Sequence, residues 1–188
     1  MSWTPLTTSR SCSSIILGLA IEHVLQGFRG LILTRGRVKL YTPTLILAGL
    51  TLLFALQGWW ANFGMRTYVN WTFVSFLFII LHSISIYMGA ALVLPELEGE
   101  TFIDLREHYF AHKRWFFGVL LAQVVLSVAK ELALYGRLLG RTNGEFHLIF
   151  ALAVIAGAIT KRECFHKFLA PASCLLSLLY IALLFARL

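Results

Sequence analysis

The sequence predicts an all-α integral membrane protein, a bundle of about six transmembrane helices in one domain over residues 1–188. Three observations carry this prediction. Hydrophobic residues make up 59% of the chain and charged residues only 13%, with a mean hydropathy of +0.78, far above that of a soluble domain. Stretches long enough to cross ~30 Å of hydrocarbon as helices use almost the whole length. These stretches are apolar on nearly every side, whereas the strands of a membrane β-barrel would alternate.

The expected spans follow one another with short connections. They are residues 14–33, 44–63, 71–94, 115–135, 146–160 and 168–185. The fifth is short for a bilayer unless Glu145 and Lys161 lie at its two interfaces. Tryptophan and tyrosine mark several ends, among them Trp59, Trp60 and Tyr135, which is typical of membrane–water boundaries.

The first span carries the strongest chemical signal. Glu22 lies near its centre, and Gly18, Gln26 and Arg29 lie at the spacing that places them on the same helix face. A carboxylate at mid-membrane depth costs ~2.5 to 3.5 kcal/mol even on a lenient scale, so we expect this face to look inward. His23 lies directly beside the carboxylate. A cleavable signal peptide is not expected, because no small-residue cleavage site follows and the apolar character resumes after Glu22.

The third and fourth spans have polar faces of their own. The face of the third span holds Ser75, His82, Ser85 and Gly89, and that of the fourth holds Gln123, Ser127, Lys130 and Arg137, with Glu131 adjacent. Three such helices imply a shared polar interior. The second and fifth spans contribute small residues that permit close approach between helices, namely Ala48, Ala55, Gly58, Ala151, Ala153 and Gly157.

The two halves of the chain share a weak internal similarity. The residues Ala20, Glu22 and Gly27 of the first span recur as Ala129, Glu131 and Gly136 of the fourth. With three spans in each half, a duplication would give an inverted 3+3 repeat, as in many transporters.

The longest connection follows the third span and changes character along its length. It opens with acidic residues and continues from Phe102 as FIDLREHYFAHKRW. We expect an interfacial helix that is capped by Asp104 and runs into the fourth span. His108 and His112 lie one turn apart beside Glu107, a spacing that metal enzymes also use. A membrane di-iron enzyme would need several such clusters, so the two histidines are weak metal candidates.

Positive charge is unevenly distributed between alternating connections. The richer set is Arg29, Arg35, Arg37, Lys39, Arg106, Lys113, Arg114, Lys161, Arg162 and Lys167. The positive-inside rule makes that side cytoplasmic, which places both termini outside the cytoplasm. The cluster of Arg35, Arg37 and Lys39 suits anionic lipid. The formal net charge of +7 forms no continuous basic face, so nucleic acid is not an expected partner.

Several segments of the chain resemble known sequences. They are residues 102–118, the stretch LGLAIEHVLQGFRGLI followed by RGRVKLY, the pair Trp59 and Trp60, and the ending LLYIALLF. Together they resemble widespread small bacterial membrane proteins that are carried as uncharacterised, and the similarity spans most of the chain. The resemblance implies a multi-pass helical protein of the bacterial inner membrane and assigns no reaction, ligand or site.

Three classes of function fit these features. The first is a small transporter or ion channel that handles ions or protons, and we expect it to be a homo-oligomer. Its polar path would comprise Glu22, His23, Gln26, Arg29, His82, Lys130 and Glu131. The second is a non-catalytic accessory or signalling subunit whose charges are structural pairs. Glu22 would then pair with Arg29 or Lys130, and Glu131 with Lys130 or Arg137.

The third class is a membrane enzyme with histidine-bound metal or haem, for which His23, His82 and His147 are the deep candidates. The sequence leans away from an enzyme, since it contains no phosphate-binding glycine loop and no nucleophile elbow. The three cysteines are few, widely separated and odd in number, so neither a disulfide framework nor a cysteine metal site follows. No cofactor is predicted.

Overall fold

The computed structural model of the protein describes residues 5–65, 71–96 and 102–184. Within those ranges the chain forms α1 (Pro5–Leu33), β1 (Val38–Lys39), α2 (Thr42–Gly64), α3 (Phe73–Val93), β2 (Ile103–Asp104), α4 (Leu105–Tyr135), α5 (Arg141–Ile159) and α6 (Glu163–Leu184). All six helices are long and apolar enough to cross a membrane. The predicted all-α, multi-pass membrane fold is confirmed.

The predicted spans each coincide with one helix, although α1, α4, α5 and α6 begin at least five residues earlier than the spans predicted for them. Helix α5 starts at Arg141, and its 19 residues rise ~28 Å, close to the thickness of the hydrocarbon core. Its polar first turn is held by an ion pair of 3.0 Å between Arg141 Nε and Glu145 Oε1. Helix α4 starts at Leu105, where Asp104 accepts hydrogen bonds from the N–H groups of Arg106 and Glu107. The predicted end of the sixth span, Phe185, lies outside the described residues.

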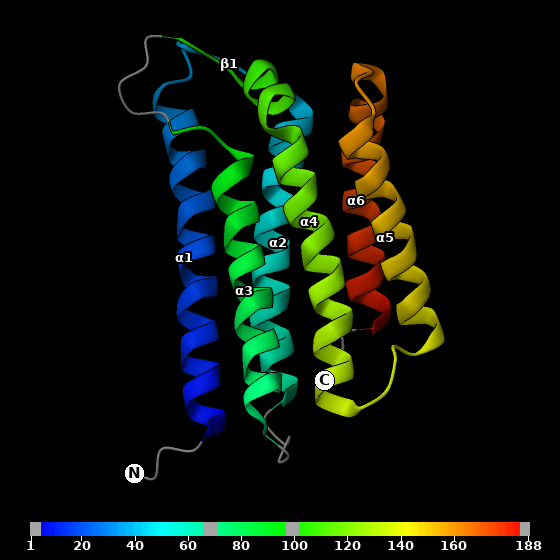
Figure 1. The fold of residues 1–188 in the computed structure, drawn as a ribbon. Helices are drawn as coiled ribbons and strands as arrows, with labels where there is room; N and C mark the ends of the chain where they lie inside the picture. The colour runs from blue at the N-terminus through cyan, green and yellow to red at the C-terminus, as the bar shows by residue number, and fades with distance from the viewer. Residues whose placement is uncertain (1–4, 66–70, 97–101, 185–188) are drawn as a thin grey trace.

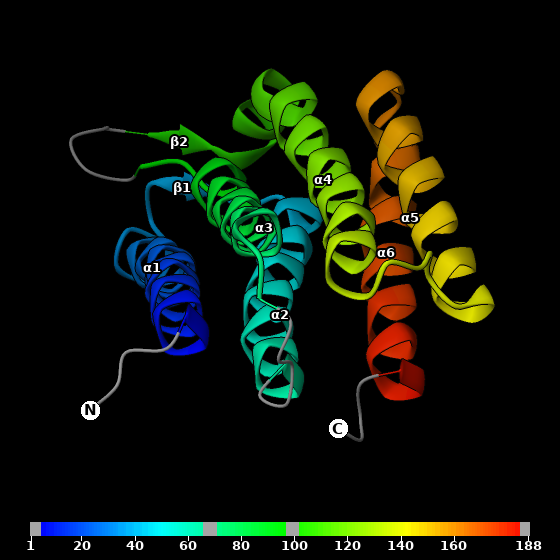
Figure 2. The same cartoon turned by 60° about the horizontal axis from the view of Figure 1, so that its bottom comes forward.

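The helices run up and down along one common direction (Figure 1). Helix α1 begins and α6 ends at the same end of the bundle, here called the terminus end, while β1 lies at the opposite end, the strand end (Figure 1). Seen obliquely from the terminus end, α1 occupies one edge and α5 the other (Figure 2). Helix α1 packs on α2 and α3, α4 packs on α3 and α5, and α6 packs on α2 and α5. Helix α1 therefore has neighbours on one side only.

A short parallel strand pair joins two connections at the strand end. Val38 pairs with Ile103 and Lys39 with Asp104, and the N–H of Ile103 donates to the carbonyl of Arg37 at 3.0 Å. The pair fastens the α1–α2 connection to the start of α4. Two-residue strands carry no periodic pattern, so this pair could not be predicted from the sequence.

Small residues allow the helices to approach closely, as predicted for the second and fifth spans. Ala48 and Ala55 of α2 are fully buried. A Cβ on Gly58 would lie 3.2 Å from Ile86 of α3, and one on Gly157 would lie 2.7 Å from the Phe117 ring of α4. A methyl group on Gly157 would overlap the Phe117 ring, and one on Gly58 would press on Ile86, so glycine allows the closest approach at both positions.

The matched residues of the suggested repeat occupy different environments. Gly27 lies inside α1, whereas Gly136 ends α4 in the left-handed conformation, with φ +63°. Ala20 is fully buried, while Ala129 is only partly buried. An inverted repeat therefore stays a prediction.

Candidate functional site

A cavity of about 430 Å³ lies between α2, α4, α5 and α6, with His82 of α3 at its wall. Leu47, Phe117 and Val154 are among its apolar lining residues. Its polar lining residues are Gln57, His82, Gln123, Ser127, Lys130, Glu131, Arg137, Asn143, His147, Ser173 and Tyr180. An apolar hollow with a few convergent polar groups is the usual form of a small-molecule site, so this central cavity is the candidate functional site.

Four of the polar groups come from one face of α4, here called the α4 polar face and comprising Gln123, Ser127, Lys130 and Glu131. The residues are spaced three or four apart, which stacks their side chains along one side of a helix. All four line the central cavity, as does Arg137 in the connection that follows. The prediction that the polar face of the fourth span looks into the bundle is confirmed.

Hydrogen bonds tie the terminus end of the cavity together across three helices. The ring of His147 donates from Nδ1 to the Asn143 carbonyl at 2.9 Å, so the neutral ring accepts at Nε2 from the Ser127 hydroxyl, 3.0 Å away. The Tyr180 hydroxyl donates to Asn143 Oδ1 at 3.1 Å. This network fixes one wall of the cavity and the tautomer of His147.

The remaining polar groups of the cavity have no such partners. The Lys130 ammonium, the His82 ring and the Gln123 amide form no hydrogen bond or ion pair with another described residue. The nearest opposite charge to Lys130 is its neighbour Glu131. An ammonium without a committed carboxylate at membrane depth is costly, which marks Lys130 as the residue best placed to receive a ligand.

The polar face of α1 does not belong to this site, and the expectation that it looks inward is wrong for a single chain. Gly18, Glu22, Gln26 and Arg29, here called the α1 polar face, are all exposed on the outside of the bundle. The Glu22 carboxylate accepts a hydrogen bond from the Gln26 amide. The opposite face of α1 carries larger apolar groups, and these are the ones that pack against α2 and α3.

The structure also separates the other predicted path residues. His23 lies against the Tyr87 ring, with the ring centres 6.3 Å apart, and does not line the cavity. None of the ion pairs considered for Glu22 or Glu131 is formed among the described residues. The candidate path therefore divides into an outer group on α1 and an inner group of His82, Lys130 and Glu131.

The histidines bear on the metal and haem alternatives. Within residues 5–65, 71–96 and 102–184, no three His, Cys, Asp or Glu side chains are grouped so that they could hold a metal ion. His112 is hydrogen-bonded to the carbonyl of His108, one turn away. Of the deep histidines, His82 and His147 share the cavity and His23 does not. A haem ligand at His147 Nε2 would have to displace the Ser127 hydroxyl.

Two buried polar residues near the strand end were missed by the sequence analysis. The Lys113 ammonium, only 5% exposed, donates to the carbonyls of Ala158, at 3.1 Å, and Thr160 at the end of α5. The His166 ring donates from Nε2 to the Thr160 carbonyl and accepts at Nδ1 from the Tyr109 hydroxyl, 2.8 Å away. Both side chains satisfy the carbonyls that α5 leaves unpaired where it ends. Their partners lie far away in sequence, so no local pattern signals them.

Comparisons with known proteins were made on the whole chain. No family model, no curated protein and no solved structure matches it.

Proposed function

We propose that the protein is a small membrane transporter that binds an amphipathic organic anion in the central cavity and carries it across the bilayer together with a proton. The observation that supports this most directly is the Lys130 ammonium, which lines a cavity of about 430 Å³ and forms no hydrogen bond or ion pair within the described chain. A bound anion would supply the missing partner.

The composition of the cavity favours a ligand with two unlike parts. Apolar side chains such as Leu50 and Phe54 form one portion of the lining, and the α4 polar face forms another. A ligand that buries an apolar body there gains ~25 cal/mol per Å² of covered surface. Its anionic group would meet Lys130, with Gln123 and His82 as further partners.

The balance of charge favours coupling to a proton. Arg137 lies at the terminus end of the cavity, so deeper inside an anion that neutralises Lys130 leaves the carboxylate of Glu131 as the remaining charge. Protonation of Glu131 would remove that charge. A neutral cavity costs less free energy to move or close within the membrane than a charged one. Glu131 is therefore the proposed proton carrier.

The lining residues favour access from one side at a time. The cavity reaches the terminus end through Arg137 and Leu139, while Leu47, Phe117 and Val154 line it farther toward the strand end. A site that is reached from one face suits alternating access better than a continuous pore.

We further propose a bacterial inner membrane as the location, with the strand end in the cytoplasm. The connection that contains Arg35, Arg37 and Lys39 lies at the strand end, as does the start of α4 (Figure 1). Helix α4 has 31 residues, or ~46 Å, which exceeds the hydrocarbon thickness. Its charged first turns would then lie at the interface, and the nearby arginines would meet anionic lipid.

Uptake into liposomes tests the transport proposal. The probe is radiolabelled naphthalenesulfonate, an aromatic anion whose permanent charge prevents unaided passage through lipid. We expect uptake by the wild type and a loss on the order of tenfold or more in Lys130→Gln, because hydrogen bonds to charged groups contribute ~1.5–3 kcal/mol. The matched control is Lys161→Gln, which removes an exposed lysine from the α5–α6 connection. Equal uptake in wild type and Lys130→Gln would contradict the proposal.

The α1 polar face supports a second candidate, an accessory or signalling subunit that binds a partner helix, or a homo-oligomer. A carboxylate that faces lipid is costly, and a neighbouring helix would cover Glu22 and Gln26. Co-purification of a stable membrane partner, lost in Glu22→Leu, would favour the subunit. A wild type and a Glu22→Leu variant that are both monomeric and without partner in mild detergent would count against it.

A further inference from the structure

The strand end contains a second cavity, of about 490 Å³, between β1 and the starts of α2, α4 and α6. It is lined by Lys39, Leu40, Tyr41, Thr42, Pro43, Ile46, Arg106, Glu163 and Lys167, and is here called the strand-end pocket. We propose that the strand-end pocket binds the phosphate group of an anionic phospholipid. This inference does not depend on the transport proposal.

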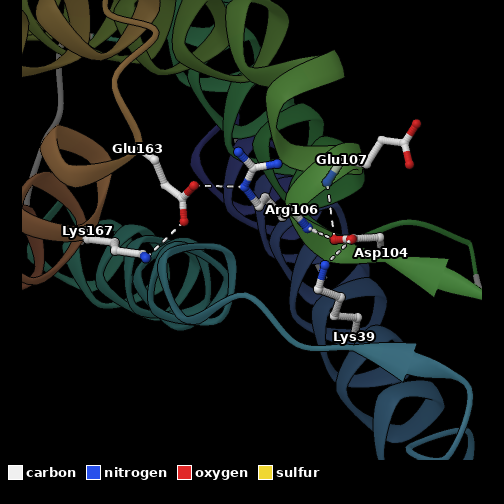
Figure 3. A network of polar contacts seen from close by, with 6 residues as sticks. All are labelled: Lys39, Asp104, Arg106, Glu107, Glu163 and Lys167. Atoms are coloured by element: carbon white, nitrogen blue, oxygen red, sulfur yellow. Dashed lines mark hydrogen bonds and ion pairs between the residues drawn. The ribbon is translucent and has the colours of Figure 1, made fainter.

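The pocket is positively charged and its cations are held in place (Figure 3). Glu163 accepts from Arg106 Nε and from Lys167 Nζ, each at 2.8 Å. Lys39 Nζ lies 2.9 Å from Asp104 Oδ2, and Asp104 is outside the lining. With Asp104 counted, three cations face two carboxylates, which leaves a net charge of +1, so the pocket attracts an anion. All three cationic side chains are at least half exposed, at 63%, 51% and 59% for Lys39, Arg106 and Lys167, so a ligand can reach them.

Arg106 keeps its binding fork free. Only Nε is used for Glu163 (Figure 3), and no other described residue bonds the two terminal nitrogens. The guanidinium lies over the Phe110 ring, 5.4 Å from its centre, which restrains its plane. A planar, restrained guanidinium with two free N–H₂ groups matches the oxygens of a phosphate.

Tyr41 supplies an independent pointer to a ligand. Its side chain is 5% exposed and packs on the rings of Tyr109 and Phe110, yet its buried hydroxyl hydrogen-bonds no other described residue. The hydroxyl lies near enough to Glu163 and Arg106 to interact with their charges. Burial raises the pKa of Tyr41 to about 12, so the group remains a neutral donor at physiological pH. An unpartnered buried donor is costly, and a ligand oxygen would satisfy it.

The position of the pocket favours a lipid over a soluble phosphate compound. The pocket lies where α2, α4 and α6 begin, at the depth expected for headgroups. Leu40, which is 58% exposed, and Ile46 lie beside the charged groups. Such a site offers a basic end to a headgroup and an apolar wall to an acyl chain.

Lipid binding to the full-length protein tests the proposal. The protein is placed in phosphatidylcholine nanodiscs with increasing phosphatidylglycerol, and retained lipid is counted by native mass spectrometry. We expect selective retention of phosphatidylglycerol by the wild type. Affinity should fall about fivefold in Arg106→Gln and in Lys167→Gln, the effect of one cation near an anionic headgroup. Arg106→Lys should recover part of the loss, since it restores charge but not the fork.

Tyr41→Phe distinguishes lipid binding in the strand-end pocket from general attraction to surface charge, because it removes a hydrogen-bond donor and no charge. We expect it to lower phosphatidylglycerol affinity as well, and it keeps the test decisive if the Arg106 variant does not fold. The matched control is Arg141→Gln, which removes an arginine paired with Glu145 on α5 and should bind like the wild type. Wild-type affinity in both Tyr41→Phe and Lys167→Gln would overturn the proposal. Displacement of the lipid by millimolar inorganic phosphate would also overturn it, in favour of a soluble phosphate ligand.

Discussion

The α1 and α4 polar faces have the same helical spacing and opposite locations. Glu22 and its neighbours on α1 face away from the bundle, whereas Lys130 and its neighbours on α4 line the central cavity. Helix α1 packs only on α2 and α3, at the edge of the bundle, while α4 lies between α3 and α5. The sequence of one helix thus determines that it has a polar face. The position of that helix in the bundle determines whether the face points inward or outward.

The direction of the α1 polar face is explained by the residues on the opposite side of the helix. The back of α1 is made of Leu17, Ala20 and Val24, all at most 1% exposed. Their packing against α3 buries apolar surface, which is favourable. Because α1 has neighbours on one side only, it can bury only this one face. The polar face is left outside by default, where a carboxylate needs either lipid headgroups, water or another helix.

The largest expected difference between the two faces is in proton-coupled uptake, which should depend on Glu131 and not on Glu22. A pH gradient of one unit should drive about tenfold accumulation of naphthalenesulfonate by the wild type, if one proton moves with each anion. Glu131→Gln, which mimics the protonated side chain, should still bind the anion but abolish the accumulation. Glu22→Gln should leave it unchanged. Accumulation by Glu131→Gln equal to the wild type, measured in the same liposomes, would remove Glu131 from the proposed mechanism.

Added bulk on two glycines distinguishes a packed from an open helix face. A Cβ on Gly157 would lie within 3 Å of both Phe117 and Leu169, while one on Gly18 would have nothing within 4 Å. We expect Gly157→Val to lower the free energy of unfolding by ~1–3 kcal/mol or more through overpacking. Gly18→Val should change it by less than ~1 kcal/mol, the small difference in helix propensity between glycine and valine. Denaturation in detergent, followed by circular dichroism, measures both, and equal losses would show that Gly18 is covered.

Lys113 tests how much an internal cation stabilises the end of a neighbouring helix. Lys113→Met leaves the Ala158 carbonyl without its donor and the Thr160 carbonyl with His166 alone, and should cost ~1–3 kcal/mol of unfolding free energy. Lys161→Met, at an exposed position in the α5–α6 connection, should fall within ~0.5 kcal/mol of the wild type. A Lys113→Met variant as stable as this control would mean that water replaces the ammonium.

The smallest expected effect on stability is that of the Asp104 charge, since the ion pair of Asp104 with Lys39 is exposed. Its hydrogen bond with Lys39 lowers the pKa of the Asp104 carboxyl below its ordinary value. The associated stability is complete above the unfolded pKa of ~3.9 and is lost as pH falls through the lower folded pKa. Thermal unfolding between pH 5 and 2, values chosen to bracket that range, should show a small extra loss in the wild type that Asp104→Asn lacks. Identical pH profiles would show that the pairing of β1 with β2 does not need the charge.

Residue type and spacing were enough to predict much of this molecule. Six apolar stretches became six helices, Asp104 caps α4 as expected, and the α4 polar face looks inward. Each of these follows from local chemistry, namely span length, a carboxylate one residue before a helix, and a repeat of three to four residues.

The features that could not be predicted depend on contacts between distant segments. The outward direction of Glu22 depends on the edge position of α1, and the Lys113 contacts depend on α5 ending beside α4. His166 is fully buried, yet nothing in its neighbours along the chain distinguishes it from an exposed histidine. The central cavity could be anticipated only in part, since Asn143 and Tyr180 join it from helices whose own sequences show no polar face.

The fastening of α5 and α6 at the strand end limits how the cavity can change shape. Lys113 and the Tyr109–His166 hydrogen bond pin the junction of these helices to α4, whereas the far end of α5 joins α4 through a turn that contains Gly136 and Gly140. A pair of helices held in this way can rotate about the hydrogen-bonded junction. The cavity would then open most beside Arg137, while its strand end stays closed.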